Sequence, residues 1–274
     1  MTQHSWQQSF AAYIRPQVLG MSFLGFSAGL PFLLVFSTLS AWLRDTGVTL
    51  SVIGFFSWVG ITYSIKVIWA PVVDRLPLPF LTRLLGKRRS WMLLAQVGIA
   101  AGLMVLAELD PLSQIELIAI TAVGIAFCSA TQDIVIDAYR IESIEAEYQA
   151  AMAAMYVFGY RVALLVAGAG TFYIAEYIGW NAAYSAMALF MFIGMVTTLL
   201  SREPEHQQDD KRIAQQQKIE SALGVQTQKG VLQRLSTWFS DVVVSPFADF
   251  FVRNGSTAIW ILALIALYKM SDIT

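Results

Sequence analysis

The chain has 274 residues, a net charge of −1, and a composition that is 57% hydrophobic and only 14% charged. Soluble domains carry about a quarter charged residues, so this composition predicts an integral membrane protein and argues against a soluble one. One cysteine, Cys128, excludes an intrachain disulfide and a cysteine-based zinc cluster.

The start of the chain, residues 1–17, is polar and lacks the apolar core of a cleavable signal peptide, which predicts a short tail. Residues 18–200 then contain six apolar stretches, each long enough for a helix to cross a bilayer. We therefore predict an all-α membrane domain with six spans, at 18–43, 48–73, 90–106, 115–138, 150–174 and 181–200.

Small residues interrupt the apolar pattern of the first and fifth spans. The first span contains Gly25, Gly29 and Pro31, and the fifth contains Gly159 and Gly168. Glycine lets a neighbouring helix approach closely, and proline removes a backbone hydrogen bond and permits a bend. This pattern is compatible with static close packing and with a bundle that moves between two states.

The connection between the second and third spans contains a charge pattern. Residues 70–75 read Ala-Pro-Val-Val-Asp-Arg and residues 86–89 read Gly-Lys-Arg-Arg. They resemble the loop signature of the major facilitator superfamily, although alanine stands first in place of glycine and an insertion with two prolines separates the parts. In that family these charges pair with neighbouring helix ends and stabilise one access state. The resemblance implies a gating role, with a role in membrane orientation alone as the alternative, for Asp74, Arg75, Arg88 and Arg89.

The fourth predicted span carries charges within its apolar run. Helical spacing places Asp133, Asp137 and Arg140 on one face, together with Ser129. Carboxylates at membrane depth are costly and normally face a bundle interior or a wet pathway, so we predict that Asp133 and Asp137 couple transport to protons. Two structural alternatives stay open: an Asp137–Arg140 pair that anchors the helix end, and an Asp133–Arg161 ion pair between neighbouring helices.

The basic residues of the chain are concentrated on one side of the predicted bundle. In this topology 14 of the 18 Lys and Arg residues fall in the tail and in the connections after the even-numbered spans. Arg44 is the only basic residue in the opposite connections, and Lys66, Arg161 and Lys269 lie within spans. The positive-inside rule therefore predicts a cytoplasmic N-terminus.

Residues 201–256 break the hydrophobic pattern. The part at 202–229 is charged and Gln-rich and predicts a flexible cytoplasmic linker, and the part at 231–252 predicts an amphipathic helix on the membrane surface. A further apolar stretch at 257–274 predicts the start of a seventh span, and we expect the chain to be incomplete. Six spans, a long loop and a seventh span are the plan of a major facilitator, with a free-standing six-helix protein as the alternative.

Three stretches together resemble the muropeptide permeases, the AmpG family. They are 58–75, with a lysine eight residues before the loop aspartate, 129–140, which reads Ser-Ala-Thr-Gln-Asp-Ile-Val-Ile-Asp-Ala-Tyr-Arg, and 267–272. The fourth-span core is also similar to the acetyl-CoA transporters, and the arginine motif that the wider family has on this helix is absent. The resemblance implies proton-driven import of N-acetylglucosaminyl-anhydro-N-acetylmuramyl peptides across a bacterial inner membrane.

A muropeptide carries carboxylates, hydroxyls and acetamides, which gives the charges within the spans a task. We predict that cations meet its carboxylates and that tyrosine rings and an amide meet its sugars, with core packing as the alternative for the rings. The predicted substrate-binding residues are Lys66, Arg161, Lys269, Tyr63, Tyr160 and Gln132.

The sequence shows no nucleophile–base pair, metal-ligand cluster or phosphate-binding loop, and His4 and His206 lie in polar segments. We therefore expect no enzyme activity, no cofactor, no metal and no nucleic-acid partner; the expected partners are a muropeptide, protons and the lipid bilayer. A transporter of acetyl-CoA or another organic anion is the alternative of the same superfamily, and a membrane enzyme or scaffold is the alternative from another class.

Overall fold

The computed structural model describes residues 13–204, 251–255, 257–261 and 264. The chain divides into two units, Met1–Asp209 and Asp210–Thr274. In the first unit six helical stretches are long and apolar enough to cross a membrane, which confirms the six predicted spans. They are Pro16–Asp45, Leu50–Ile68, Lys87–Glu108, Ile115–Glu142, Ala146–Tyr177 and Trp180–Leu200.

The first span consists of two helices, α2 (Pro16–Val35) and α3 (Ser37–Asp45). Pro31 lies inside α2, and the interruption comes after it at Phe36, whose φ and ψ of −116° and −100° are not helical. The expected irregularity of this span is therefore present.

The second span is segmented into α4 (Leu50–Phe55), a 3₁₀ turn (Phe56–Trp58), α5 (Val59–Ser64) and a second 3₁₀ turn, η2 (Ile65–Ile68). It ends earlier than predicted, because a separate helix, α6 (Ala70–Arg75), begins after Trp69 with Pro71 in its first turn. Proline is tolerated in a first turn, where its missing N–H has no partner to lose. Helix α7 (Leu81–Leu85) follows in the connection.

The remaining spans are α8 (Lys87–Glu108), α9 (Ile115–Glu142), α10 (Gln149–Leu165) continued by α11 (Thr171–Tyr177), and α12 (Trp180–Leu200). A π-helical turn, Val166–Gly170, joins α10 to α11. The Thr38 hydroxyl on α3 donates to the carbonyl of Ala167 in this turn at 3.1 Å, so a side chain satisfies part of its irregular backbone.

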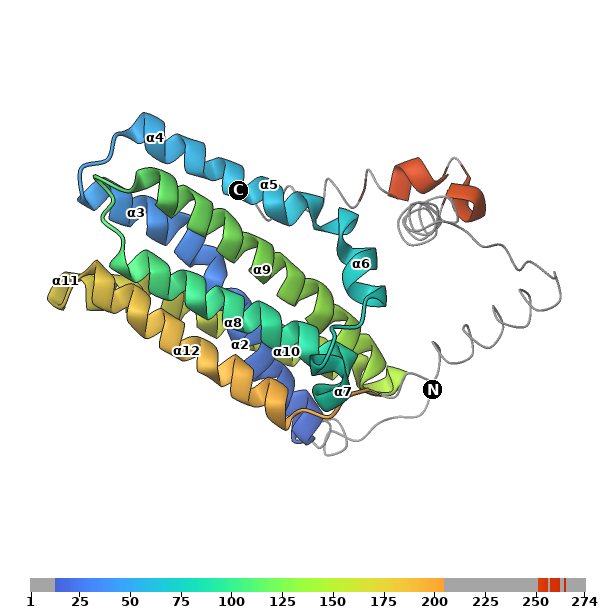
Figure 1. The fold of residues 1–274 in the computed structure, drawn as a ribbon. Helices are drawn as coiled ribbons and strands as arrows, with labels where there is room; N and C mark the ends of the chain where they lie inside the picture. Colours follow the sequence, from blue (N-terminus) through green and yellow to red (C-terminus); the bar gives the residue numbers. More distant parts are fainter. Residues whose placement is uncertain (1–12, 205–250, 256, 262–263, 265–274) are drawn as a thin grey trace. The chain divides into compact units, whose positions relative to one another are not determined.

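Helix α2 is central in the bundle and packs against α10, α12 and α9, while α8 packs between α9 and α12. Figure 1 shows the long helices running side by side, with α5 beside α9 at one edge and α12 beside α8 at the other. Because glycines line the α2–α10 contact, the two backbones approach closely at Gly25 and Gly159. Two apolar clusters fill the interior, one around Leu34, Leu103 and Tyr184 and the other around Met21 and Ile136.

The second unit is described only at 251–255, 257–261 and 264, where 251–254 and 257–261 are helical. Lys269 and almost all of the predicted amphipathic segment at 231–252 lie outside the described residues. The predicted domain boundaries remain predictions.

Candidate functional site

The Lys66 side chain on η2 reaches Asp133 on α9, with 3.3 Å between Nζ and Oδ2. The two side chains are 32% and 20% exposed, so this pair is neither sealed in the core nor fully solvated. The alternative ion pair between Asp133 and Arg161 does not form among the described residues, and Arg161 lies exposed on α10. Of the two cations Lys66 and Arg161, the one that pairs with Asp133 is therefore on the second span and not on the fifth.

Three tyrosines lie around this pair, Tyr63 on α5 and Tyr156 and Tyr160 on α10, all close to Asp133 or to one another. The Tyr63 hydroxyl is buried beside Ser129 without a hydrogen bond of standard geometry to a described residue. The Asp133 region thus combines a cation, which can bind an anionic group, with a carboxylate and aromatic hydroxyls, which can bind polar groups.

Two residues before Asp133 on α9, the Thr131 hydroxyl accepts a hydrogen bond from the Trp69 indole at 3.2 Å. The same indole packs on Phe127, with 4.9 Å between ring centroids. These contacts hold the end of the second span against α9, so Lys66 is positioned by its own helix and not by its charge alone.

Gln132 lies on another face of α9, inside the bundle. Its side chain is fully buried, and its amide donates to the Ser27 hydroxyl on α2 at 2.8 Å. Gln96 on α8 is equally buried and accepts from the Thr198 hydroxyl on α12 at 3.0 Å. In this conformation the Gln132 amide connects two helices, and its predicted substrate-binding role stays a prediction without support from its position.

Asp137 is 58% exposed as a side chain and lies 3.6 Å from Arg140 on the same helix. This is the pair that the helix-anchor alternative expects, so the geometry separates Asp137 from Asp133. The proton-coupling role of both residues remains a prediction, and Asp133 has the environment that suits it better.

The loop charges between the second and third spans meet at one end of the bundle, called here the basic end. Arg88 is nearly buried, with 8% of its side chain exposed, and contacts Asp74 through Nη1 at 2.7 Å. Its Nε and Nη2 donate to both oxygens of Glu142 at 2.9 and 2.6 Å. Arg88 therefore connects α6, α8 and the end of α9. Arg75 is exposed on α6.

Glu142 is not among the residues predicted from the sequence, because a carboxylate at a helix end beside Arg140 looks like an ordinary surface charge. The feature of the sequence that could have identified Glu142 is its position at the end of a span that already contains other acidic residues. The structure shows that it forms the two-oxygen, fork-like contact with Arg88 that gives arginine–carboxylate pairs their geometric specificity.

Two further contacts complete the basic end. Arg89 donates through Nε and Nη2 to the carbonyls of Thr198 and Leu199 at the end of α12, at 2.9 and 2.6 Å. Arg15 donates to the Tyr148 hydroxyl at 2.8 Å and connects the start of α2 to the α9–α10 connection.

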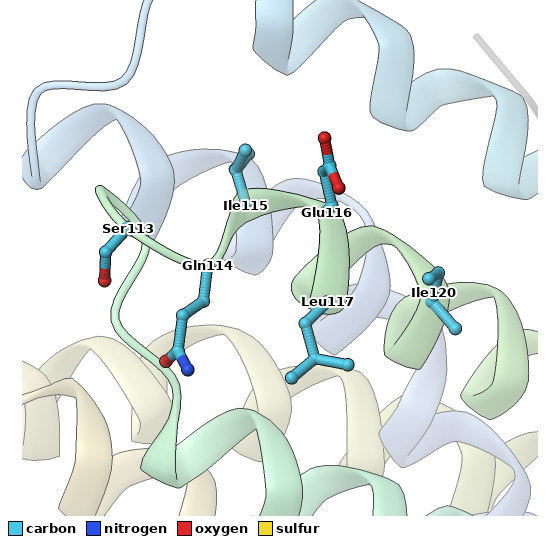
Figure 2. Close-up of a pocket in the computed structure, with 6 residues that line it drawn as sticks. All are labelled: Ser113, Gln114, Ile115, Glu116, Leu117 and Ile120. Carbon is cyan, nitrogen blue, oxygen red and sulfur yellow. The ribbon is translucent and has the colours of Figure 1, made fainter.

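At the other end of the bundle a pocket is lined by Ser113, Gln114, Ile115, Glu116, Leu117 and Ile120 (Figure 2). It surrounds the start of α9, where the Ser113 hydroxyl and the Leu112 N–H lower the pKa of Asp110. Its last member, Ile120, is 13 residues from Asp133 along α9, or roughly 20 Å. The pocket is therefore separate from the Lys66–Asp133 site. No cluster of three metal-ligating side chains occurs in the described part of the chain.

Comparison with known proteins places these observations in a family context. The model of the Major Facilitator Superfamily matches residues 18–272. The chain is 36% identical over 267 residues to the anhydromuropeptide permease of Escherichia coli strain K12, covering 97% of this chain and 48% of that protein. It is 31% identical over 251 residues to the putative transporter AmpG 4 of Rickettsia conorii, covering 91% of this chain and 55% of that protein. The chain thus spans about half the length of the curated relatives that it matches, and the resemblance to the AmpG family is confirmed.

Proposed function

The chain belongs to the Major Facilitator Superfamily, and from this membership we propose that it is part of a proton-coupled importer of muropeptides in a bacterial inner membrane. Similarity to a protein named anhydromuropeptide permease supports the substrate class. Six apolar helices make the chain a multi-pass membrane protein. The direction, the proton coupling and the cytoplasmic N-terminus are part of the proposal.

The Lys66–Asp133 pair is the observation that carries the proposal. A cation and a carboxylate within membrane spans are costly to insert, by about 2.5–3.5 kcal/mol each on the insertion scale, so their retention indicates a function. The pair is partly exposed, and the exposed Arg161 supplies a second cation on another span. Peptide carboxylates of a muropeptide are the anions that such cations attract.

Coupling follows from competition for Lys66. In the structure Lys66 lies beside Asp133, with 3.3 Å between Nζ and Oδ2. A substrate carboxylate that binds Lys66 would compete with Asp133 for the ammonium, and a proton taken up by Asp133 would balance the charge of the substrate carboxylate. The net charge of the pair with its bound anion and proton equals that of the empty pair. Substrate and proton would therefore enter together.

The basic end supplies the closing element. Arg88, at the start of α8, holds α6 and the end of α9 through Asp74 and Glu142. If this end is cytoplasmic, as the distribution of Lys and Arg favours, these contacts close the cytoplasmic side while the site opens to the periplasm. Breaking them would open the opposite access state, as alternating access requires.

The proposal is tested by transport in proteoliposomes that contain the complete gene product. We expect uptake of labelled N-acetylglucosaminyl-anhydro-N-acetylmuramyl tripeptide to be accelerated by an inward proton gradient. Labelled acetyl-CoA is offered in parallel, and preference for it would replace the substrate assignment with the organic-anion alternative. Asp133→Asn should abolish gradient-driven accumulation, while Glu116→Gln, an exposed carboxylate near the start of the same helix, should not. Accumulation by Asp133→Asn at the unmutated rate would remove Asp133 from the coupling step.

A further inference from the structure

Glu203, which follows α12, binds the first turn of α8 across 115 residues of sequence. Its two carboxylate oxygens accept the backbone N–H groups of Arg88 and Arg89 at 2.8 and 3.1 Å. The first N–H groups of a helix have no partner within the helix, and a carboxylate there also interacts favourably with the helix dipole. Glu203 therefore supplies the cap that the preceding residue, Gly86, does not provide through a side chain.

The backbone at Gly86 is shaped to receive this carboxylate. Gly86 has a φ of +87°, a conformation that glycine adopts without strain, and a Cβ at this position would overlap the Glu203 side chain. The missing Cβ of Gly86 leaves the space that the Glu203 side chain occupies, and Glu203 is only partly exposed there.

The reverse contact is made by Arg89, whose guanidinium donates to the carbonyls of Thr198 and Leu199 at the C-terminal end of α12. An acid that follows α12 thus caps the start of α8, and a base at the start of α8 caps the end of α12. Both contacts place a charged group where it interacts favourably with a helix dipole, and together they join the start of α8 to the end of α12.

The amide that Glu203 holds belongs to Arg88, whose side chain contacts Asp74 and Glu142. Arginine needs a fixed backbone to place its rigid fork on two carboxylates at once. Arg88, Asp74 and Glu142 form what is called here the closing cluster. We infer that Glu203 is a positioning residue of this cluster: it fixes the backbone of Arg88 so that the guanidinium reaches α6 and α9 together. Glu203 thus joins the short segment that directly follows α12 to the basic end.

Residues 202–229 are predicted to form a flexible linker, but Glu203 in this segment contacts α8, and Pro204 is buried. The positioning role of Glu203 depends only on its contacts. The role of the closing cluster in transport rests on the proposed function.

Hydrogen exchange tests the inference without any substrate. In Glu203→Gln the first-turn amides of α8 should exchange about tenfold faster, since a hydrogen bond to a charged group is lost. If Glu203 acts through Arg88, the ends of α6 (Ala70–Arg75) and α9 near Glu142 should also exchange faster. In an Arg88→Gln background those remote segments should already be released, and Glu203→Gln should change them no further. Glu203→Asp, which keeps the charge, should restore most of the protection.

Glu147→Gln is the matched control, because Glu147 is exposed near the same end of the bundle and is not part of these contacts. Faster exchange confined to the first turn of α8 would show a simple helix cap and overturn the positioning role. The same conclusion would follow if Glu203→Gln changed exchange equally with and without Arg88→Gln. The positioning role would also be overturned if Glu203→Gln behaved like Glu147→Gln. In the transport assay we expect Glu203→Gln to lower the maximal rate about tenfold with KM unchanged. Failure of all muropeptide uptake would overturn the proposed function while leaving the exchange result to stand alone.

Discussion

Gly159 on α10 lies directly against the backbone of Ser22 on α2, so close that a Cβ on Gly159 would overlap the Ser22 carbonyl oxygen. The reciprocal contact one helical turn away is between Gly25 and the carbonyl of Tyr156. Because α10 carries Tyr156 and Tyr160, this glycine contact determines how the fifth span presents those side chains next to the site.

We expect Gly159→Ala to destabilise the bundle. Backbone atoms cannot move aside as a flexible side chain can, so the helices must separate, and overpacking of this kind costs about 1–3 kcal/mol. Thermal unfolding in detergent measures the effect. Gly124→Ala on α9 is the matched control, because a Cβ there meets nothing within 4 Å and alanine favours a helix. Equal melting temperatures for the two variants would contradict the close contact.

The Lys66–Asp133 pair predicts that each single substitution harms the protein more than the double one. Lys66→Gln or Asp133→Asn removes this contact and leaves the other charge of the pair within the membrane, at a cost of about 1–3 kcal/mol for a pair that is partly exposed. The double variant removes both charges and should recover most of the stability without recovering proton coupling. Thermal unfolding and uptake are measured on the same four proteins. Purely additive losses of stability would show that the two residues do not interact.

Arg88→Lys should weaken the closing cluster although the charge is kept. Lysine cannot bind both oxygens of Glu142 and also reach Asp74, so we expect a loss of about 1–2 kcal/mol and a slower transport cycle. Arg83→Lys on α7 is the control, because Arg83 is exposed. The unfolding temperature and the maximal uptake rate are measured. If Arg88→Lys is as stable and transports as fast as the control, the fork-like contact contributes to neither.

Orientation is tested by labelling single cysteines in a Cys128→Ala background. A cysteine at Asp110, in the connection between α8 and α9, should react with an impermeant thiol reagent in spheroplasts. A cysteine at Glu147, near the basic end, should react only after the membrane is permeabilised, since most basic residues lie on its side. The reverse labelling pattern would place the N-terminus in the periplasm.

The parts of the molecule that depend on local composition can be predicted from the amino-acid sequence alone. Six apolar runs must become helices, because a backbone in lipid has to satisfy its own hydrogen bonds and the length of each run matches the bilayer. Helical spacing likewise placed Asp133 and Asp137 on one face of the fourth span, and the loop signature marked Asp74 and Arg88. These predictions need no knowledge of which helices are neighbours.

Which side chains meet depends on how the helices pack in three dimensions. Lys66, and not Arg161, lies beside Asp133, and Gln132 turns inward to Ser27, because the rotation and neighbours of each helix follow from interhelical packing. Glu142 and Glu203 joined Arg88 from the ends of other helices, over 54 and 115 residues of sequence. Periodicity assigns a residue to a face of its own helix, but the contact that this face makes is set by close packing at positions such as Gly25 and Gly159, which no local pattern encodes.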